Sequence, residues 1–233
     1  DVDRETAVTN ALELAQYLPP ETVAELYTQQ AEYSFAAEPD ETLAAINQAL
    51  TLEAELTRDQ QARLLPQQAH LLAEAGRWPD ALAVIAEALR LRTFFDEPTQ
   101  AALYDLRGHL YFAQGDWQKA VTEAESALAL NDELAWSHAA LAWQAYRAAD
   151  FATAQSEADA ALTLDDSVGL AYTVQGALLT WQGDVHGALD ALEMALMHNP
   201  DDVEALALQM FNLSEMSAFA ELPTLAETAV AAQ

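Results

Sequence analysis

The sequence predicts an all-α protein in which short helix pairs stack into a solenoid. Between Leu103 and Asp132, an apolar pattern of helical period runs to Phe112, breaks at Gly115-Asp116 and resumes from Trp117 to Leu130. The same unit recurs at a fixed interval on both sides of this segment. A single helix pair cannot bury its apolar face, so the pairs must stack on one another. The hydrophobic fraction of 52% is ample for such a continuous core.

The repeat interval is 34 residues, from Asp116 to Asp150 and from Asp150 to Asp184. Small and large apolar positions keep the same spacing: Ala120, Ala154 and Ala188; Ala127, Ala161 and Ala195; Leu128, Leu162 and Leu196. Upstream, the interval is 39 residues, from Trp78 to Trp117 and from Ala49 to Ala88. We expect the alanines to let neighbouring helices approach closely and the leucines to fill the space between successive pairs.

This pattern resembles the tetratricopeptide repeat in its period and in the residues Gly108, Tyr111, Gly115-Asp116-Trp117, Ala120 and Ala127. Pro200 stands at that family's closing proline, whereas Asp132 and Asp166 stand there in the two preceding repeats. The resemblance covers nearly the whole chain and implies a right-handed α-solenoid of helix-turn-helix repeats, with about 13 helices. The expected organisation is an N-terminal capping helix (1–20), about five repeats (21–200) and a C-terminal partial or capping repeat (201–233).

Local signals place several helix boundaries. A helix is expected from Asp3 to Leu18, ended by Pro19-Pro20. Pro39 and Pro79 are expected in the first turns of second helices, where a missing N–H costs nothing. Further expectations are a capping box at Thr57 to Gln60, a kink at Pro66, and helix N-caps at Asp165-Asp166 and Asp201-Asp202.

The chain is strongly acidic, with 38 Asp and Glu against 9 Lys and Arg and a net charge of −29. This balance argues against binding nucleic acid, which needs a basic footprint, and against anionic membrane surfaces. One interpretation is long-range attraction of a cationic partner. The other is a solvated acidic surface, which would make the fold more stable at high ionic strength.

The sequence predicts neither an enzyme nor a cofactor or metal site. GxGxxG, GxxxxGK[ST], HExxH and GxSxG are all missing, there is no cysteine, and no two histidines stand four residues apart on a helix. No apolar run is long enough to insert into a membrane. The chain begins at Asp1, and one explanation is a removed secretory signal, which would make the protein exported; the compartment stays unknown.

The resemblance implies a concave surface lined by the first helix of each pair. The positions that it assigns to a partner-binding groove are Tyr27, Phe35, His70, Asp105, His109, Phe112, Trp136, Trp143, Tyr146, Arg147, Trp181 and Phe211. Trp136, Trp143 and Tyr146 share one helical face and are either core residues or anchors for a ligand segment. A carboxylate clamp known in the family is absent, because its positions carry Asp105, His109, Ala139 and Trp143.

Two functions follow from these residues. The first is a protein-interaction scaffold whose aromatic, acidic groove holds a peptide or helix of apolar and cationic character. The second is a structural homo-oligomer or polymer, because a contact between solenoid ends that does not close gives a filament. Candidate self-association residues are Leu222, Leu225 and Val230 in the apolar final helix, together with Phe94 and Phe95. The phenylalanine pair is expected either to pack between repeats or to form an exposed contact.

Overall fold

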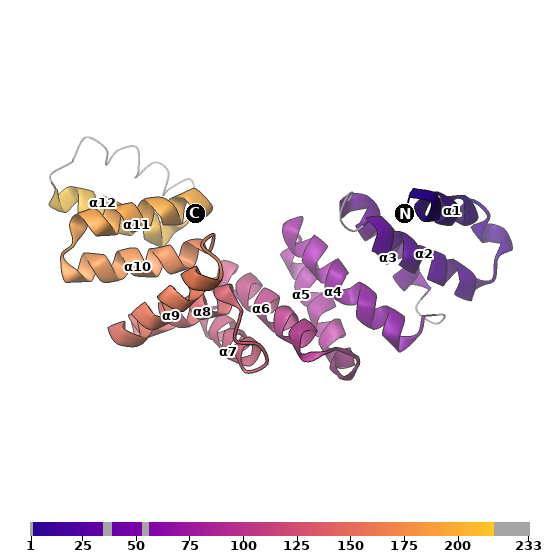
Figure 1. Cartoon of the computed structure of the whole chain (residues 1–233), viewed down its shortest axis with the longest axis horizontal. Helices are drawn as coiled ribbons and strands as arrows, with labels where there is room; N and C mark the ends of the chain where they lie inside the picture. Colours follow the sequence, from indigo (N-terminus) through magenta and orange to yellow (C-terminus); the bar gives the residue numbers. More distant parts are fainter. Residues whose placement is uncertain (1, 35–38, 53–55, 217–233) are drawn as a thin grey trace. The chain divides into compact units, whose positions relative to one another are not determined.

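The computed structural model describes residues 2–34, 39–52 and 56–216, and every regular element within them is a helix (Figure 1). The predicted all-α solenoid of helix pairs is confirmed. Twelve α-helices fall in the described residues, and the thirteenth expected helix lies outside them. The chain divides into two compact units, unit 1 (Asp1–Leu110) and unit 2 (Tyr111–Gln233), which are described separately.

Unit 1 holds the first two helix pairs and the N-terminal helix. Its elements are α1 (Val2–Leu12), the 3₁₀ turn η1 (Ala15–Tyr17), α2 (Pro20–Ser34), α3 (Pro39–Thr51), α4 (Arg58–Glu74), α5 (Trp78–Ala88), the 3₁₀ segment η3 (Leu89–Phe94) and most of α6 (Glu97–Ala113). Helix α2 packs with α3, and α4 packs with α5. The core of this unit includes Ile46, Leu64, Leu65 and Ile85, all essentially inaccessible to solvent.

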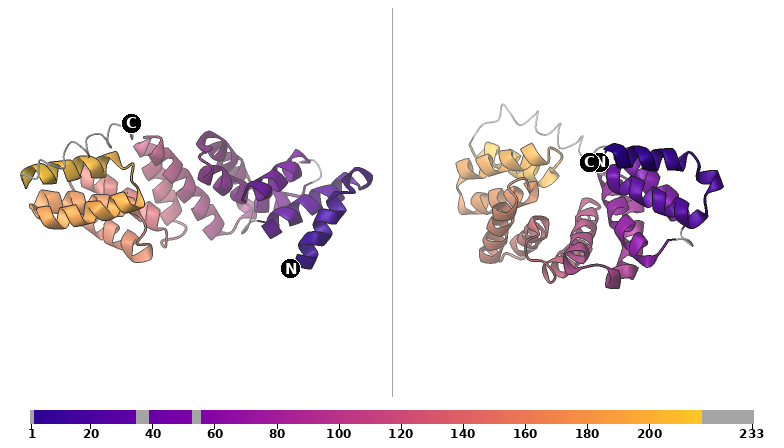
Figure 2. Two further views of the ribbon diagram at one scale, coloured as in Figure 1. Left: turned by 90° about the horizontal axis from the view of Figure 1, so that it is seen from above. Right: turned by 45° about the vertical axis from the view of Figure 1, so that its right-hand side comes forward.

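Unit 2 is built of closely similar helix pairs. Its helices are the end of α6, α7 (Trp117–Leu128), α8 (Ala135–Arg147), α9 (Phe151–Leu164), α10 (Gly169–Gln182), α11 (Val185–His198) and α12 (Val203–Glu215). Helix α8 packs with α9, and α10 packs with α11, a pairing that Figure 2 shows from two further directions. The first helices of successive pairs also meet, since α10 contacts both α8 and α12.

The 34-residue period comes from a repeated turn. Asp116, Asp150 and Asp184 cap α7, α9 and α11, each accepting a hydrogen bond from the backbone N–H three residues later, at 3.3, 3.2 and 3.1 Å. The residue before each aspartate is left-handed: φ is 79° at Gly115, 60° at Ala149 and 80° at Gly183. The backbone therefore reverses in the same way at each step.

The periodic small residues lie where helices approach most closely. Ala120, Ala154, Ala188, Ala127, Ala161 and Ala195 are all fully buried. At Gly176 of α10 even a methyl group would collide, because an added Cβ would stand 2.6 Å from Cγ of Leu192 on α11. The predicted role of small residues in close helix packing is therefore confirmed in unit 2.

Two local expectations need correction. Helix α1 ends at Leu12 instead of Leu18, and η1 follows it before Pro20 opens α2. Pro66 lies inside α4, which runs on to Glu74, and the kink expected there stays a prediction. Asp202 caps α12 as expected, but Asp165 follows the end of α9, where its carboxylate accepts from Ser167.

Other local predictions are confirmed. Pro39 is the first residue of α3, and Pro79 lies in the first turn of α5. The capping box at the start of α4 is complete: the Thr57 backbone N–H donates to the Gln60 side chain at 2.8 Å, and the Gln60 backbone N–H donates to the Thr57 hydroxyl at 3.2 Å.

Candidate interaction surface

Seven aromatic side chains of unit 2 make a continuous series of ring contacts, which we name the aromatic series. Phe112 meets Trp117 edge-to-face with centroids 4.3 Å apart, and Phe151 meets Trp181 at the same distance. The remaining four contacts have centroids 5.9 Å apart. In order, the series is Trp136, Phe112, Trp117, Trp143, Tyr146, Phe151 and Trp181.

The capped turns create this series. Trp117 and Phe151 are the first residues of α7 and α9, directly after the aspartate caps. Each ring reaches the first helix of the following pair, Trp117 meeting Trp143 and Phe151 meeting Trp181. The groove positions predicted from the sequence do not include Trp117 and Phe151, although the steps Asp116-Trp117 and Asp150-Phe151 are one repeat interval apart. Val185 occupies the next such position, so the step that would extend the series lacks a ring.

Trp143 is a core residue, which corrects its assignment as an exposed anchor. Only 4% of its surface is accessible, because it packs with Ala142, Ala154, Ala158 and Val174. Its indole N–H is buried and has no hydrogen-bond partner among the described residues. Trp136 and Tyr146, on the same helix, are half-buried. On this helical face, Trp143 is therefore a core residue, whereas Trp136 and Tyr146 keep part of their surface accessible.

The most accessible ring of the aromatic series is Trp181, with 63% of its surface exposed at the end of α10. Trp117 is 37% exposed, and the Arg147 guanidinium carbon lies 5.9 Å from its ring centroid. Burial and, secondarily, the negative charge of Glu204 raise the pKa of Tyr146. Glu204 belongs to α12, the first helix of the second pair after α8, so an acidic group two pairs further along adds to the field around this series.

The other expected groove residues are placed as follows. On unit 1, Tyr27 is half-buried against the core, and Asp105 is half-buried as well. His109 is exposed, and so is His70, whose Nε2 lies 3.2 Å from Glu74 Oε1. On unit 2, Phe211 of α12 is 52% exposed. Phe35, Leu222, Leu225 and Val230 lie outside the described residues.

The phenylalanine pair splits between its two interpretations. Phe95 packs against the core formed by α4, α5 and α6, whereas Phe94 is 49% exposed. Within the described ranges, no group of three or more His, Asp or Glu side chains could hold a metal ion. No described helix is long and apolar enough to cross a membrane.

A family model for the tetratricopeptide repeat matches residues 60–133, which run from the first turn of α4 past the end of α7. Residues 60–133 of this chain therefore carry the tetratricopeptide repeat. The match begins and ends inside the array of helix pairs, and the capped turns extend the same period through α11. No curated protein matches the chain by sequence.

Three solved structures share this fold. The crystal structure of YrrB, described as a TPR protein with an unusual peptide-binding site, matches with a TM-score of 0.56 and 19% identity over 87% of this chain and 97% of that one. The Cut9–Hcn1 hetero-tetramer of the APC/C matches with a TM-score of 0.64 and 17% identity, over 99% of this chain and 43% of the other. MamA matches with a TM-score of 0.53 and 16% identity, over 78% and 94%.

Proposed function

We propose that this protein is an interaction scaffold that holds a peptide or helix of a partner protein against the exposed end of the aromatic series. The observation that carries the proposal is the Trp181 indole, which is exposed yet supported by Phe151 at 4.3 Å. A tryptophan held in place by a neighbouring ring loses little conformational freedom on binding. Such residues are typical anchors of protein interfaces.

Charge supports a partner with basic as well as apolar residues. The chain carries a net charge of −29, and Glu204 acts on Tyr146 within the aromatic series. A cationic segment would be attracted over a distance comparable with the Debye length, about 8 Å at physiological ionic strength. An indole face also attracts Lys and Arg side chains directly. We therefore expect ligands that combine a large apolar residue with Lys or Arg.

The proposal is tested by selecting peptides from a random 16-residue phage library on the full chain and measuring their affinities by fluorescence anisotropy. Truncation of an anchor residue costs at least about 2 kcal/mol, so Trp181→Ala should weaken the selected peptides roughly 30-fold. Met197→Ala is the matched control, because Met197 is 62% exposed on α11 and lies outside the aromatic series. Equal weakening by both changes, or by neither, contradicts the proposal.

A second candidate function is a self-assembling structural subunit. It is favoured by two exposed apolar side chains on α12 and at its end, Phe211 (52%) and Met216. Phe211 stands two repeat intervals after Trp143. Trp143 is contacted by Trp117, but the position equivalent to Trp117 in the later repeat is Val185, which has no ring. Light scattering across protein and salt concentration decides the matter. Particles that grow with concentration and shrink in Phe211→Glu support assembly, and a monodisperse monomer rejects it.

A further inference from the structure

The positive charge of this acidic chain is concentrated in unit 1. Residues 58–107 carry six of the nine Lys and Arg residues but only seven of the 38 Asp and Glu residues. That stretch is almost neutral, whereas the remainder of the chain has 31 acidic residues against 3 basic ones. An acidic surface approaching this protein therefore meets the least electrostatic repulsion along this stretch.

Two arginines of this stretch have no polar partner in the part of the chain that the structure describes. Arg90 and Arg92 lie on η3 and are exposed, and neither makes an ion pair or a hydrogen bond there. By contrast, the guanidinium of Arg77 pairs with the Asp80 carboxylate at 2.7 Å. The 3₁₀ segment η3 thus presents two guanidinium groups to a carboxylate from outside.

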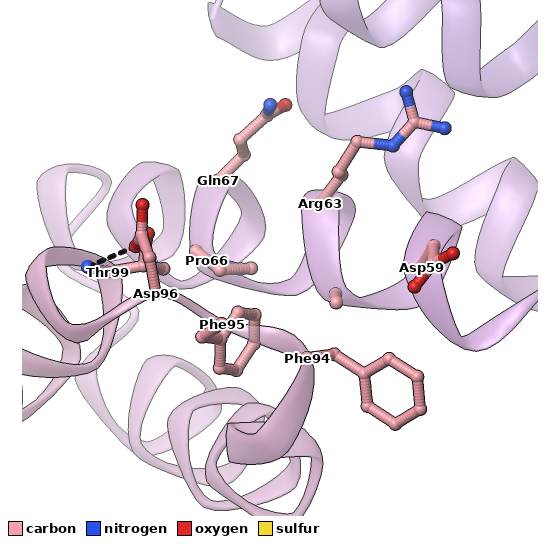
Figure 3. Close-up of a pocket in the computed structure, with 9 residues that line it drawn as sticks. Asp59, Arg63, Pro66, Gln67, Phe94, Phe95, Asp96 and Thr99 are labelled. Carbon is pink, nitrogen blue, oxygen red and sulfur yellow. Dashed lines mark hydrogen bonds between the residues drawn. The ribbon is translucent and has the colours of Figure 1, made fainter.

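An exposed ring adjoins these arginines. Phe94 is the last residue of η3 and is 49% exposed, whereas Phe95 packs against the core. In Figure 3 the two rings, which line the same open pocket beside α4, point in different directions. Arginine and aromatic residues are enriched at protein interfaces and dominate their binding energy. We name Arg90, Arg92 and Phe94 the η3 surface.

Helix α12 of unit 2 presents the opposite charge around a similar ring. Four exposed residues recur there at steps of three and four and share one face of the helix: Glu204, Ala207, Phe211 and Glu215. Phe211 is 52% exposed. Neither glutamate carboxylate makes an ion pair or a hydrogen bond with a described residue. This face, which we name the α12 surface, therefore has an aromatic ring between two carboxylates.

We propose that the η3 surface of one copy of this protein binds the α12 surface of a second copy. The Phe94 ring packs on Phe211 of the second copy, and the two arginines pair with the glutamates on either side of that ring. Because the contact joins two different surfaces, each copy can make it twice, and the chains assemble head to tail. The inference rests on the second candidate function, self-assembly, and assigns the surfaces that carry it.

Charge determines which of the two surfaces meet. Each copy carries a net charge of −29, so two copies repel over most of their surface. At about 0.15 M salt this repulsion is screened beyond roughly 8 Å, whereas charges in direct contact are screened much less. Contact of two η3 surfaces would place arginines against arginines, and contact of two α12 surfaces would place glutamates against glutamates. Only the mixed contact joins opposite charges.

The experiment is sedimentation velocity of the full chain across protein concentration at about 0.15 M salt. We expect the weight-average mass of the wild type to rise with concentration. Arg90→Glu/Arg92→Glu should weaken association at least about tenfold, and so should Glu204→Arg/Glu215→Arg, because each double change places like charges in contact. Association of either variant as strong as that of the wild type would overturn the proposed contact.

The control is Glu125→Arg/Glu193→Arg, which makes the same change of net charge as the reversed α12 surface. Both positions are exposed, on α7 and α11, and lie outside the two surfaces. This variant should associate at least as strongly as the wild type, because it lowers the repulsion between copies. Weakening equal to that of the reversed α12 surface would show that net charge alone governs association, against the proposed contact.

Mixing the two reversed variants tests whether the surfaces meet each other. Each variant retains the surface that the other has lost, so an equimolar mixture should associate although neither variant does alone. A mixture that stays monomeric would overturn the contact. A wild type that assembles while every variant assembles equally well rejects this contact but keeps self-assembly. A wild type that stays monomeric at all concentrations rejects both.

Discussion

The Phe151 and Trp181 rings lie 4.3 Å apart at an interplanar angle of 39°, so the residue that opens α9 supports the exposed indole at the end of α10. This contact joins two consecutive helix pairs. It gives the second of them a rigid aromatic surface that its own turn, with Val185, does not provide.

The ring contact itself should contribute to stability. In a double-mutant cycle of Phe151→Leu and Trp181→Leu, the coupling free energy should be about 0.5–1.5 kcal/mol, because leucine keeps apolar volume but loses the aromatic interaction. Urea unfolding followed by circular dichroism gives the four free energies. The pair Phe151→Leu and Met197→Leu is the control cycle and should be additive. Additivity in both cycles would show that the rings merely fill space.

Ala149 should be a point of strain that glycine relieves. It holds φ at 60° where the neighbouring repeats have Gly115 and Gly183. A left-handed alanine costs about 1–2 kcal/mol, and the greater freedom of glycine in the unfolded chain offsets part of the gain. We expect Ala149→Gly to raise the free energy of unfolding by about 0.5–1 kcal/mol.

The reverse change, Gly183→Ala, is its matched partner and should lower stability by about 1 kcal/mol. An added Cβ there meets no atom within 4 Å, so the backbone conformation alone is tested. Changes of the same sign in the two variants would show that the turns are not equivalent.

Gly176 should tolerate no side chain. In Gly176→Ala the new Cβ would stand 2.6 Å from Cγ of Leu192, which is itself fully buried. Overpacking of this kind costs about 1–3 kcal/mol. Thermal unfolding should show a lower Tm for Gly176→Ala. Leu192→Ala removes the colliding Cγ and Cδ atoms and, combined with it, should recover part of the loss, so the double variant should be more stable than additivity predicts. A strictly additive double variant would place the strain elsewhere.

The aspartate caps should make stability fall in acid. Hydrogen bonds from Thr153 hold the pKa of Asp150 below its ordinary value of 3.8, and those from Lys119 do the same for Asp116. The unfolded chain then takes up these protons at a higher pH than the folded chain does. The stabilisation is therefore present above pH 4 and is lost as the pH falls through the lowered values.

Asp150→Asn is the matched variant, because an asparagine caps a helix nearly as well but does not titrate. Urea midpoints measured from pH 6 to pH 2.5 should fall less steeply for this variant than for the wild type. Parallel curves would mean that the cap carries no pH dependence.

Much of the fold could be predicted because local and periodic signals in the sequence determine it. The Asp116, Asp150 and Asp184 spacing marked the turns, and the buried alanines followed the same interval. Pro39, Pro79 and the Thr57–Gln60 capping box placed helix starts through short-range chemistry. The end of α1 was missed, since the apolar period continued past Leu12 although the backbone left the helix there.

The candidate site was less predictable. Trp143 and Trp181 are both large aromatic residues in the first helices of their pairs, and the periodicity alone predicts similar solvent exposure for both. Trp143 is buried because Trp117 from the preceding turn and the alanines of α9 close over it. Trp181 stays exposed because it stands at the last turn of α10, where only Phe151 among the described rings contacts it. Phe94 and Phe95 likewise differ because only Phe95 packs against the core of α4, α5 and α6.

The sequence by itself determined the helix pairs, their period, the capped turns and the acidic character of this protein, since propensity, capping and hydrophobic period act over a few residues. Only the tertiary structure decided which aromatic rings are buried, that seven of them touch in series, and that Arg90 and Arg92 of η3 are exposed without a polar partner among the described residues. Exposure depends on what a neighbouring helix pair brings to each side chain, and that contact comes from residues about one repeat away.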